Sequence, residues 1–91
     1  MSLVIVGGNE CMIREYKDLC KSYNCKAKVY AKMSRGLQDI GNPDLVVLFT
    51  NTVSHKMAKC AIESAKNQKI PVERIHSSSK SALKNVLEQY A

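Results

Sequence analysis

Two histidines and the hydroxyl side chains beside them are the residues of this chain best suited to ligand chemistry. An imidazole can coordinate a metal ion, donate a hydrogen bond or act as a base, and hydroxyl groups can hydrogen-bond an anion. A Gly-Gly-Asn segment and an arginine extend the set, because backbone N–H groups and a guanidinium bind phosphate or carboxylate. The complete set is Gly7, Gly8, Asn9, Arg35, Thr50, Asn51, Thr52, Ser54, His55, His76, Ser77, Ser78 and Ser79.

Each of these residues also has a purely structural interpretation. Gly7 and Gly8 can form a tight strand-to-helix turn, and they lack the further glycine or Lys-Ser/Thr pair of a nucleotide fingerprint. The serine run can cap a helix, and either histidine can be solvated or bonded within the fold. Glu10 is the only carboxylate obvious near the set, and no catalytic triad is recognisable. A binding protein is therefore favoured over an enzyme, whose site would need a second subunit.

The strands that must position these residues are marked by short apolar runs. Leu3–Val6 and Leu45–Phe49 are continuous apolar runs, typical of parallel strands that are buried on both faces. A weaker alternation predicts a less buried strand over Lys26–Ala31. A fourth strand is predicted over Ile70–Ile75, started by Pro71, because proline is tolerated at the beginning of a strand.

Helical spacing of apolar residues fills most of the intervals between these strands. It predicts a helix over residues 10–23, a second ending near Asn67 and a third with Tyr90 on its inner face. Residues 32–43 contain two glycines and a proline, which predicts a loop. The N-caps available to the second helix are Asn51, Thr52 and Ser54, and those available to the third are Ser77 and Ser78.

The alternation of strands and helices indicates parallel βαβ units with helices on both faces of a sheet. We expect a single α/β domain over residues 1–91, a small three-layer sandwich with a four-stranded parallel sheet. Its topology would be half-Rossmann or flavodoxin-like, with strand order 2-1-3-4. Ligands of such sheets bind beyond the carboxyl ends of the strands. This rule brings both histidines, the glycine turn and the Ser/Thr clusters to one rim.

Composition and charge limit the partners. The chain has 14 Lys and Arg against 8 Asp and Glu, a formal net charge of +6 that favours an anionic partner. A single phenylalanine leaves few aromatic side chains to interleave with the basic ones, so no nucleic-acid partner is expected. No apolar segment reaches the length of a signal peptide or membrane span, which predicts a cytoplasmic protein without a membrane partner. The four cysteines include no C-x2-C pair and are expected to be reduced thiols.

Several segments resemble the bacterial family known as domain of unknown function 2325. The resemblance spans nearly the whole chain and is carried by Leu3–Gly8, Phe49–His55, Pro71-Val72 and Ser77–Ser79. The stretch Phe49–His55 is its most specific part. The family is common in anaerobic Firmicutes as small stand-alone cytoplasmic proteins, so the resemblance implies the same setting here. By the family motif, the implied site residues are Thr50, Asn51, Ser54 and His55, with the serine run less closely matched.

The resemblance also implies haem binding and dioxygen chemistry in a dimer. Haem b is an apolar ring with two carboxylates, which the rim hydroxyls, Lys32 and Arg35 could meet. A porphyrin is large for 91 residues, so we expect a pocket shared by two copies of the chain. His55 and His76 are the candidate metal ligands, although Cys and Tyr can also ligate haem iron. His55 would be either an axial ligand or a residue of the distal pocket, with Thr50, Asn51 and Ser54 hydrogen-bonding around the ligand. Without a C-x-x-C-H motif, covalent attachment of the haem is excluded.

We therefore expect a homodimeric protein that binds an anionic or amphiphilic small ligand. Haem b, with a role in sensing or carrying dioxygen or electrons, is the sharpest hypothesis. The alternative is a regulatory module that binds phosphate or a nucleotide without catalysis. That alternative would use Gly7, Gly8, Arg35 and Ser77–Ser79.

Overall fold

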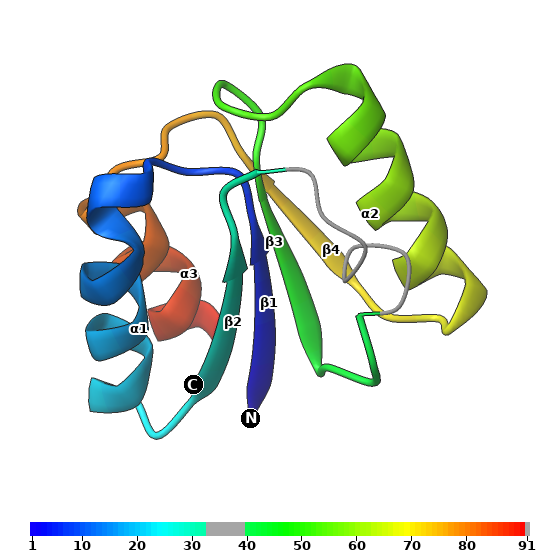
Figure 1. Ribbon diagram of the computed structural model, residues 1–91. Helices are drawn as coiled ribbons and strands as arrows, with labels where there is room; N and C mark the ends of the chain where they lie inside the picture. Colours follow the sequence, from blue (N-terminus) through cyan, green and yellow to red (C-terminus); the bar gives the residue numbers. More distant parts are fainter. Residues whose placement is uncertain (33–39, 91) are drawn as a thin grey trace.

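The computed structural model has a sheet of four parallel strands, in the order β2-β1-β3-β4 (Figure 1). The structure describes residues 1–32 and 40–90. The strands are β1 (Ser2–Val6), β2 (Lys26–Tyr30), β3 (Leu45–Phe49) and β4 (Val72–Ile75). The strand order and the parallel pairing confirm the prediction. β1 and β3 are central because their continuous apolar runs suit strands that are covered on both faces.

Helices cover both faces of this sheet, which gives the predicted three layers (Figure 1). Helices α1 (Ile13–Ser22) and α3 (Lys80–Tyr90) lie on one face, and α2 (His55–Asn67) lies on the other. Successive side chains of a strand point to opposite faces, so each central strand contributes to two cores. The core under α1 and α3 takes Leu3, Ile5, Leu45, Val47 and Phe49, and the core under α2 takes Val4, Val6, Val46 and Leu48.

Polar residues begin and end α1. The Asn9 side chain accepts a hydrogen bond of 3.0 Å from the Cys11 amide and caps a short 3-10 turn, η1 (Glu10–Met12), that leads into the helix. At the other end, Asn24 takes a left-handed conformation with φ of 59°. The Cys25 amide can then donate to the carbonyl of Cys20, at 2.9 Å, which closes the last turn.

The strand limits differ slightly from the predicted ones. β2 ends at Tyr30 and β4 starts at Val72, after Pro71, not at Ile70. The Ile70 amide donates instead to the carbonyl of Ala65, at 2.8 Å, and so ends α2. Ile70 therefore belongs to the helix terminus, although its side chain is buried in the α2-side core.

Two predictions about α3 were wrong. Its first turn is capped by Ser79, whose Oγ accepts from the Ala82 amide at 3.2 Å, and not by Ser77 or Ser78. Tyr90 does not face inward. Its side chain is 45% exposed, and its hydroxyl donates to Oε2 of Glu73 at 3.0 Å. None of the described helices has both the length and the hydropathy needed to cross a membrane.

Candidate functional site

The carboxyl edge of the sheet brings together the segments that follow three of its strands (Figure 1). The Gly7 amide donates to the carbonyl of Tyr30 at 2.9 Å, which ties the end of β1 to β2. The amides of Thr50 and Asn51 donate to the carbonyls of Ile75 and His76, at 2.8 and 3.2 Å. These bonds extend the parallel register beyond the strands. The loops that carry most of the candidate residues therefore lie side by side, as the sequence predicts.

The glycine turn after β1 is closely packed. Gly7 and Gly8 have φ of 94° and 88°, a region that residues with a Cβ rarely adopt. A Cβ on Gly7 would lie 2.5 Å from Cγ1 of Val53, and one on Gly8 would lie 2.8 Å from Cε2 of Tyr16. The Gly8 amide donates to Oγ1 of Thr52 at 2.7 Å. Because the Gly8 amide already donates to Thr52, it is not available to an anion. The turn therefore serves the fold.

Tyr16 connects the loops on the α1 and α3 side of the edge. Its side chain is fully buried, and its hydroxyl donates to the carbonyl of Ser78 at 2.6 Å. The same hydroxyl accepts from the Asn9 amide at 3.4 Å, and the ring centroid lies 5.4 Å from that of Phe49. The sequence pattern gave Tyr16 no role at this edge. A buried tyrosine usually needs a partner for its hydroxyl, and that rule could have indicated one.

Most candidate serine hydroxyls are engaged in local backbone bonds. Ser54 Oγ accepts from the Met57 amide at 3.2 Å and caps α2. Ser77 Oγ accepts from the Ser79 amide, also at 3.2 Å. Ser78 contributes its carbonyl to Tyr16, while Ser79 caps α3. The serine run thus orders the approach to α3, which is the structural interpretation of these residues.

The α2 side of the edge contains a pocket of about 250 Å³ between the start of α2 and the ends of β3 and β4. Its apolar lining is Leu48, Val53, Ala58 and Ile62, and its polar lining is Thr50, Ser54, His55 and Arg74. The His55 and Arg74 side chains are exposed and have no hydrogen bond or ion pair to any described residue. The pocket therefore combines an apolar wall with an imidazole and a guanidinium that can receive a ligand.

Arg74 is the polar residue of the pocket that the sequence did not indicate. In the parallel register Arg74 pairs with Leu48, so both side chains belong to the α2 face of the sheet. Counting alternate positions along the fourth strand, once its pairing with the third was assumed, would have placed this arginine beside the Thr50–His55 segment.

The remaining candidates do not join the pocket lining. His76 is exposed and follows β4, and its carbonyl accepts from the Asn51 amide. Arg35 lies outside the described residues. Lys32, expected to meet a haem carboxylate, forms an exposed ion pair with Glu10, with Nζ and Oε1 2.9 Å apart. Within residues 1–32 and 40–90, no three His, Cys, Asp or Glu side chains gather in a way that could hold a metal ion.

The four cysteines are free thiols in the structure. Cys11 is exposed, whereas Cys20 and Cys25 are buried beside the end of α1. Burial raises the pKa of the Cys20 thiol to about 11, and the neighbouring Cys25 adds to the shift. Cys20 therefore stays protonated near neutral pH, which makes it a packing residue and not a nucleophile.

Among the comparisons with known proteins, only the one with protein families found a match. No curated protein and no solved structure shows significant similarity to the chain. A family model described as "Uncharacterized protein conserved in bacteria (DUF2325)" matches residues 2–90, which include every described strand and helix. The chain therefore belongs to the DUF2325 family of bacterial proteins.

Proposed function

We propose that this protein binds haem b between two copies of the chain, that His55 would hold the iron, and that the protein senses or carries dioxygen or electrons. The α2-side pocket is the observation that supports this proposal. There an imidazole without a partner among the described residues stands beside apolar walls and a guanidinium. Few ligand classes need all three features together, and haem is one of them.

The pocket residues suit the chemistry of haem. The apolar side chains of Val53, Ala58 and Ile62 match the porphyrin ring. Arg74 can form charge-assisted hydrogen bonds with a propionate carboxylate. The His55 imidazole can donate a nitrogen lone pair to the iron, the commonest way in which proteins hold haem. The donor set on this side of the edge therefore fits the group.

Pocket size is the reason for including a second copy of the chain. A volume of about 250 Å³ lies below the ~300–1,000 Å³ of pockets that enclose small ligands, and haem is a large ligand. One chain can therefore cover only part of the ring. In a two-fold dimer the same pocket of the partner would cover the other part, because such interfaces use one surface twice.

When bound, haem iron supplies reversible binding of diatomic gases and one-electron chemistry. The chain's own residues would hold the iron, exclude water along the apolar wall and supply hydrogen bonds near the metal. Ser54 Oγ accepts from the Met57 amide, which leaves its own O–H group able to donate. Thr50 Oγ1 donates to the carbonyl of Ile75 at 3.4 Å, a long bond that a ligand could replace.

Titration of the purified protein with haemin, followed by absorbance, tests the proposal. We expect a saturable Soret band at a fixed ratio of haem to chain, and a dimer mass in sedimentation velocity. His55→Ala should lose or shift the band, while His76→Ala, the matched variant of the other histidine, should keep it. Absorbance that rises linearly in the wild type, as for haemin adhering to a basic surface, would refute haem binding. An identical band in His55→Ala would refute the ligand assignment.

A simple anion is the second candidate, and the position of Arg74 favours it. The guanidinium lines the same pocket as Ser54 and His55, at the start of a helix of 13 residues whose N-terminus carries partial positive charge. Thermal unfolding in phosphate and in chloride at equal ionic strength would test it. Phosphate should raise the Tm of the wild type but not of Arg74→Gln. Equal shifts in the two proteins would exclude this site.

A further inference from the structure

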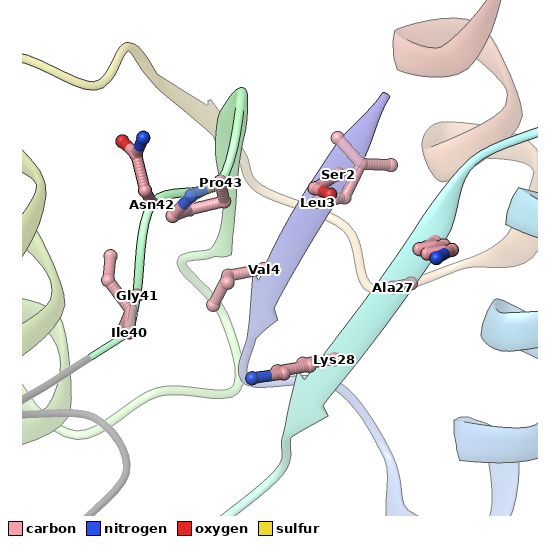
Figure 2. Close-up of a pocket in the computed structure, with 10 residues that line it drawn as sticks. Ser2, Leu3, Val4, Ala27, Lys28, Ile40, Gly41, Asn42 and Pro43 are labelled. Atoms are coloured by element: carbon pink, nitrogen blue, oxygen red, sulfur yellow. The ribbon is translucent and has the colours of Figure 1, made fainter.

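We propose that the amino edge of the sheet carries a second site, for a small amphiphilic anion with one carboxylate and a compact apolar body. The site is a crevice of about 330 Å³ between β1, β2 and the segment Ile40–Pro43. Figure 2 shows Val4 pointing from β1 toward this segment, and Lys28 extending from β2 in the same direction. The site lies at the opposite end of the strands from His55, so the inference does not depend on haem binding.

The crevice exists because one helix cannot cover a whole sheet face. The register pairs Ser2 with Lys26 and Val4 with Lys28, which sets these side chains on a common face. Val4 belongs to the core under α2, so this is the α2 face. Helix α2 packs on β1 and β3, and no described helix lies over β2 on this side (Figure 1). The outer part of the face is thus open among the described elements.

The bottom of the crevice is apolar. Val4 and Ile40 are each only 2% exposed, and Pro43 beside them is also buried. Higher up, the walls are formed by the side chains of Lys26 and Lys28, whose methylene stems add apolar surface below their charges. An apolar body would therefore enter first, with its charged group left at the opening.

Two positive charges stand at this opening. Lys26 and Lys28 are exposed and have no ion pair to any described residue. Their Cα atoms lie roughly 7 Å apart along β2. Asp44, a carboxylate at the same edge, accepts a hydrogen bond of 2.7 Å from the Ser2 amide. Repulsion between two like charges is relieved by a bound anion. The apolar bottom distinguishes this site from one for inorganic phosphate, and its volume suits a small molecule rather than a macromolecule.

Octanoate is a suitable probe, with 1-octanol as its uncharged counterpart. Binding can be followed by the backbone amide resonances of Val4, Lys28 and Ile40 in a titration of the full chain. We expect saturable shifts with octanoate and at least about tenfold weaker binding of octanol, because a charge-assisted contact is lost. No saturable shift with octanoate, or equal affinity for the two probes, would overturn the proposal.

Paired variants separate the charge of this site from the charge of the whole protein. Lys26→Gln with Lys28→Gln should weaken octanoate binding about tenfold or more. Lys80→Gln with Lys84→Gln, which removes the same charge from exposed positions on α3, should leave it within about twofold. Equal weakening in both double variants would show non-specific attraction and overturn the site. His55→Ala should bind octanoate as the wild type does. Weaker octanoate binding by this variant would mean that octanoate occupies the pocket beside His55 instead.

Discussion

The two sides of the carboxyl edge of the sheet are built in different ways. On the side of α1 and α3, the Tyr16 hydroxyl, the Gly8 amide and the Ser78 carbonyl all have partners within the chain. On the side of α2, His55 and Arg74 line a pocket and have no partner among the described residues. We refer to these as the closed side and the open side. The contrast indicates that the glycines and hydroxyls near the strand ends mostly hold the edge together. We propose that ligands bind instead to the side chains without partners.

The largest effect is expected where the closed side excludes a side chain. Gly8→Ala should lower the free energy of unfolding by about 3 kcal/mol, because φ of 88° is strained for alanine and the new Cβ would meet Tyr16. Gly41→Ala is the matched control, since Gly41 has φ of 76° but no atom within 4 Å of an added Cβ. The Gly41→Ala variant should lose only the free energy that reflects backbone strain at positive φ, about 1 kcal/mol. Equal losses of unfolding free energy, measured by urea unfolding, would mean that the residues around Gly8 accommodate an added methyl group at no extra cost.

The core under α1 and α3, which contains Cys20, should also weaken as the pH rises. The folded chain keeps the Cys20 thiol protonated up to about pH 11, whereas the unfolded chain releases this proton above its ordinary pKa of 9.0. The stability due to the neutral thiol is therefore complete below pH 9.0 and is lost between pH 9.0 and about 11, on the order of 2 kcal/mol. Unfolding measured across this range should show a steeper decline for the wild type than for Cys20→Ala. Parallel curves for the two proteins would contradict the raised pKa of the Cys20 thiol.

Removal of one hydroxyl tests the hydrogen bonds of the closed side. Tyr16→Phe should cost about 1 kcal/mol, because the Ser78 carbonyl and the Asn9 amide lose a buried partner. Tyr23→Phe is the control, since its hydroxyl bonds to Glu88 in an exposed position, 3.2 Å away. That change should cost less than about 0.5 kcal/mol. If the Tyr16 variant is as stable as the Tyr23 variant, the Tyr16 hydroxyl does not stabilise the closed side.

The smallest changes in stability are expected on the open side. His55→Ala and Arg74→Gln should each stay within about 0.5 kcal/mol of the wild type, since neither side chain contacts a described polar partner. Urea unfolding of the two variants checks this. A loss above about 1 kcal/mol would show that these residues support the fold, and the distinction between the two sides would fail.

The fold could be predicted from the sequence because its signals are local. The apolar runs of β1 and β3 mark central strands, and the residues Asn9, Asn24 and Ser54 mark helix ends within a few positions. Such signals depend on the chain's immediate neighbourhood, where spacing alone decides which groups can meet.

The site could be predicted only in outline because its contacts join distant parts of the chain. The sequence correctly predicted that Thr50, Ser54 and His55 lie at the carboxyl edge of the sheet. It could not show that Thr52 would accept a hydrogen bond from the amide of Gly8, 44 positions away. The choice of Ser79 over its neighbours as the cap of α3 depends on ångström-scale geometry. Arg74 required the pairing of β3 with β4 before its face was known.

Chemical rescue of the haemin spectrum tests the role of His55 most directly. In His55→Gly the imidazole is replaced by space, and the apolar wall and Arg74 remain in place. We expect this variant to lose the wild-type Soret band on titration with haemin, and to regain it when imidazole is added to the solution. The same treatment of His76→Gly should change nothing. If His55→Gly keeps the wild-type spectrum without imidazole, His55 does not ligate the iron and the open side is not the haem site.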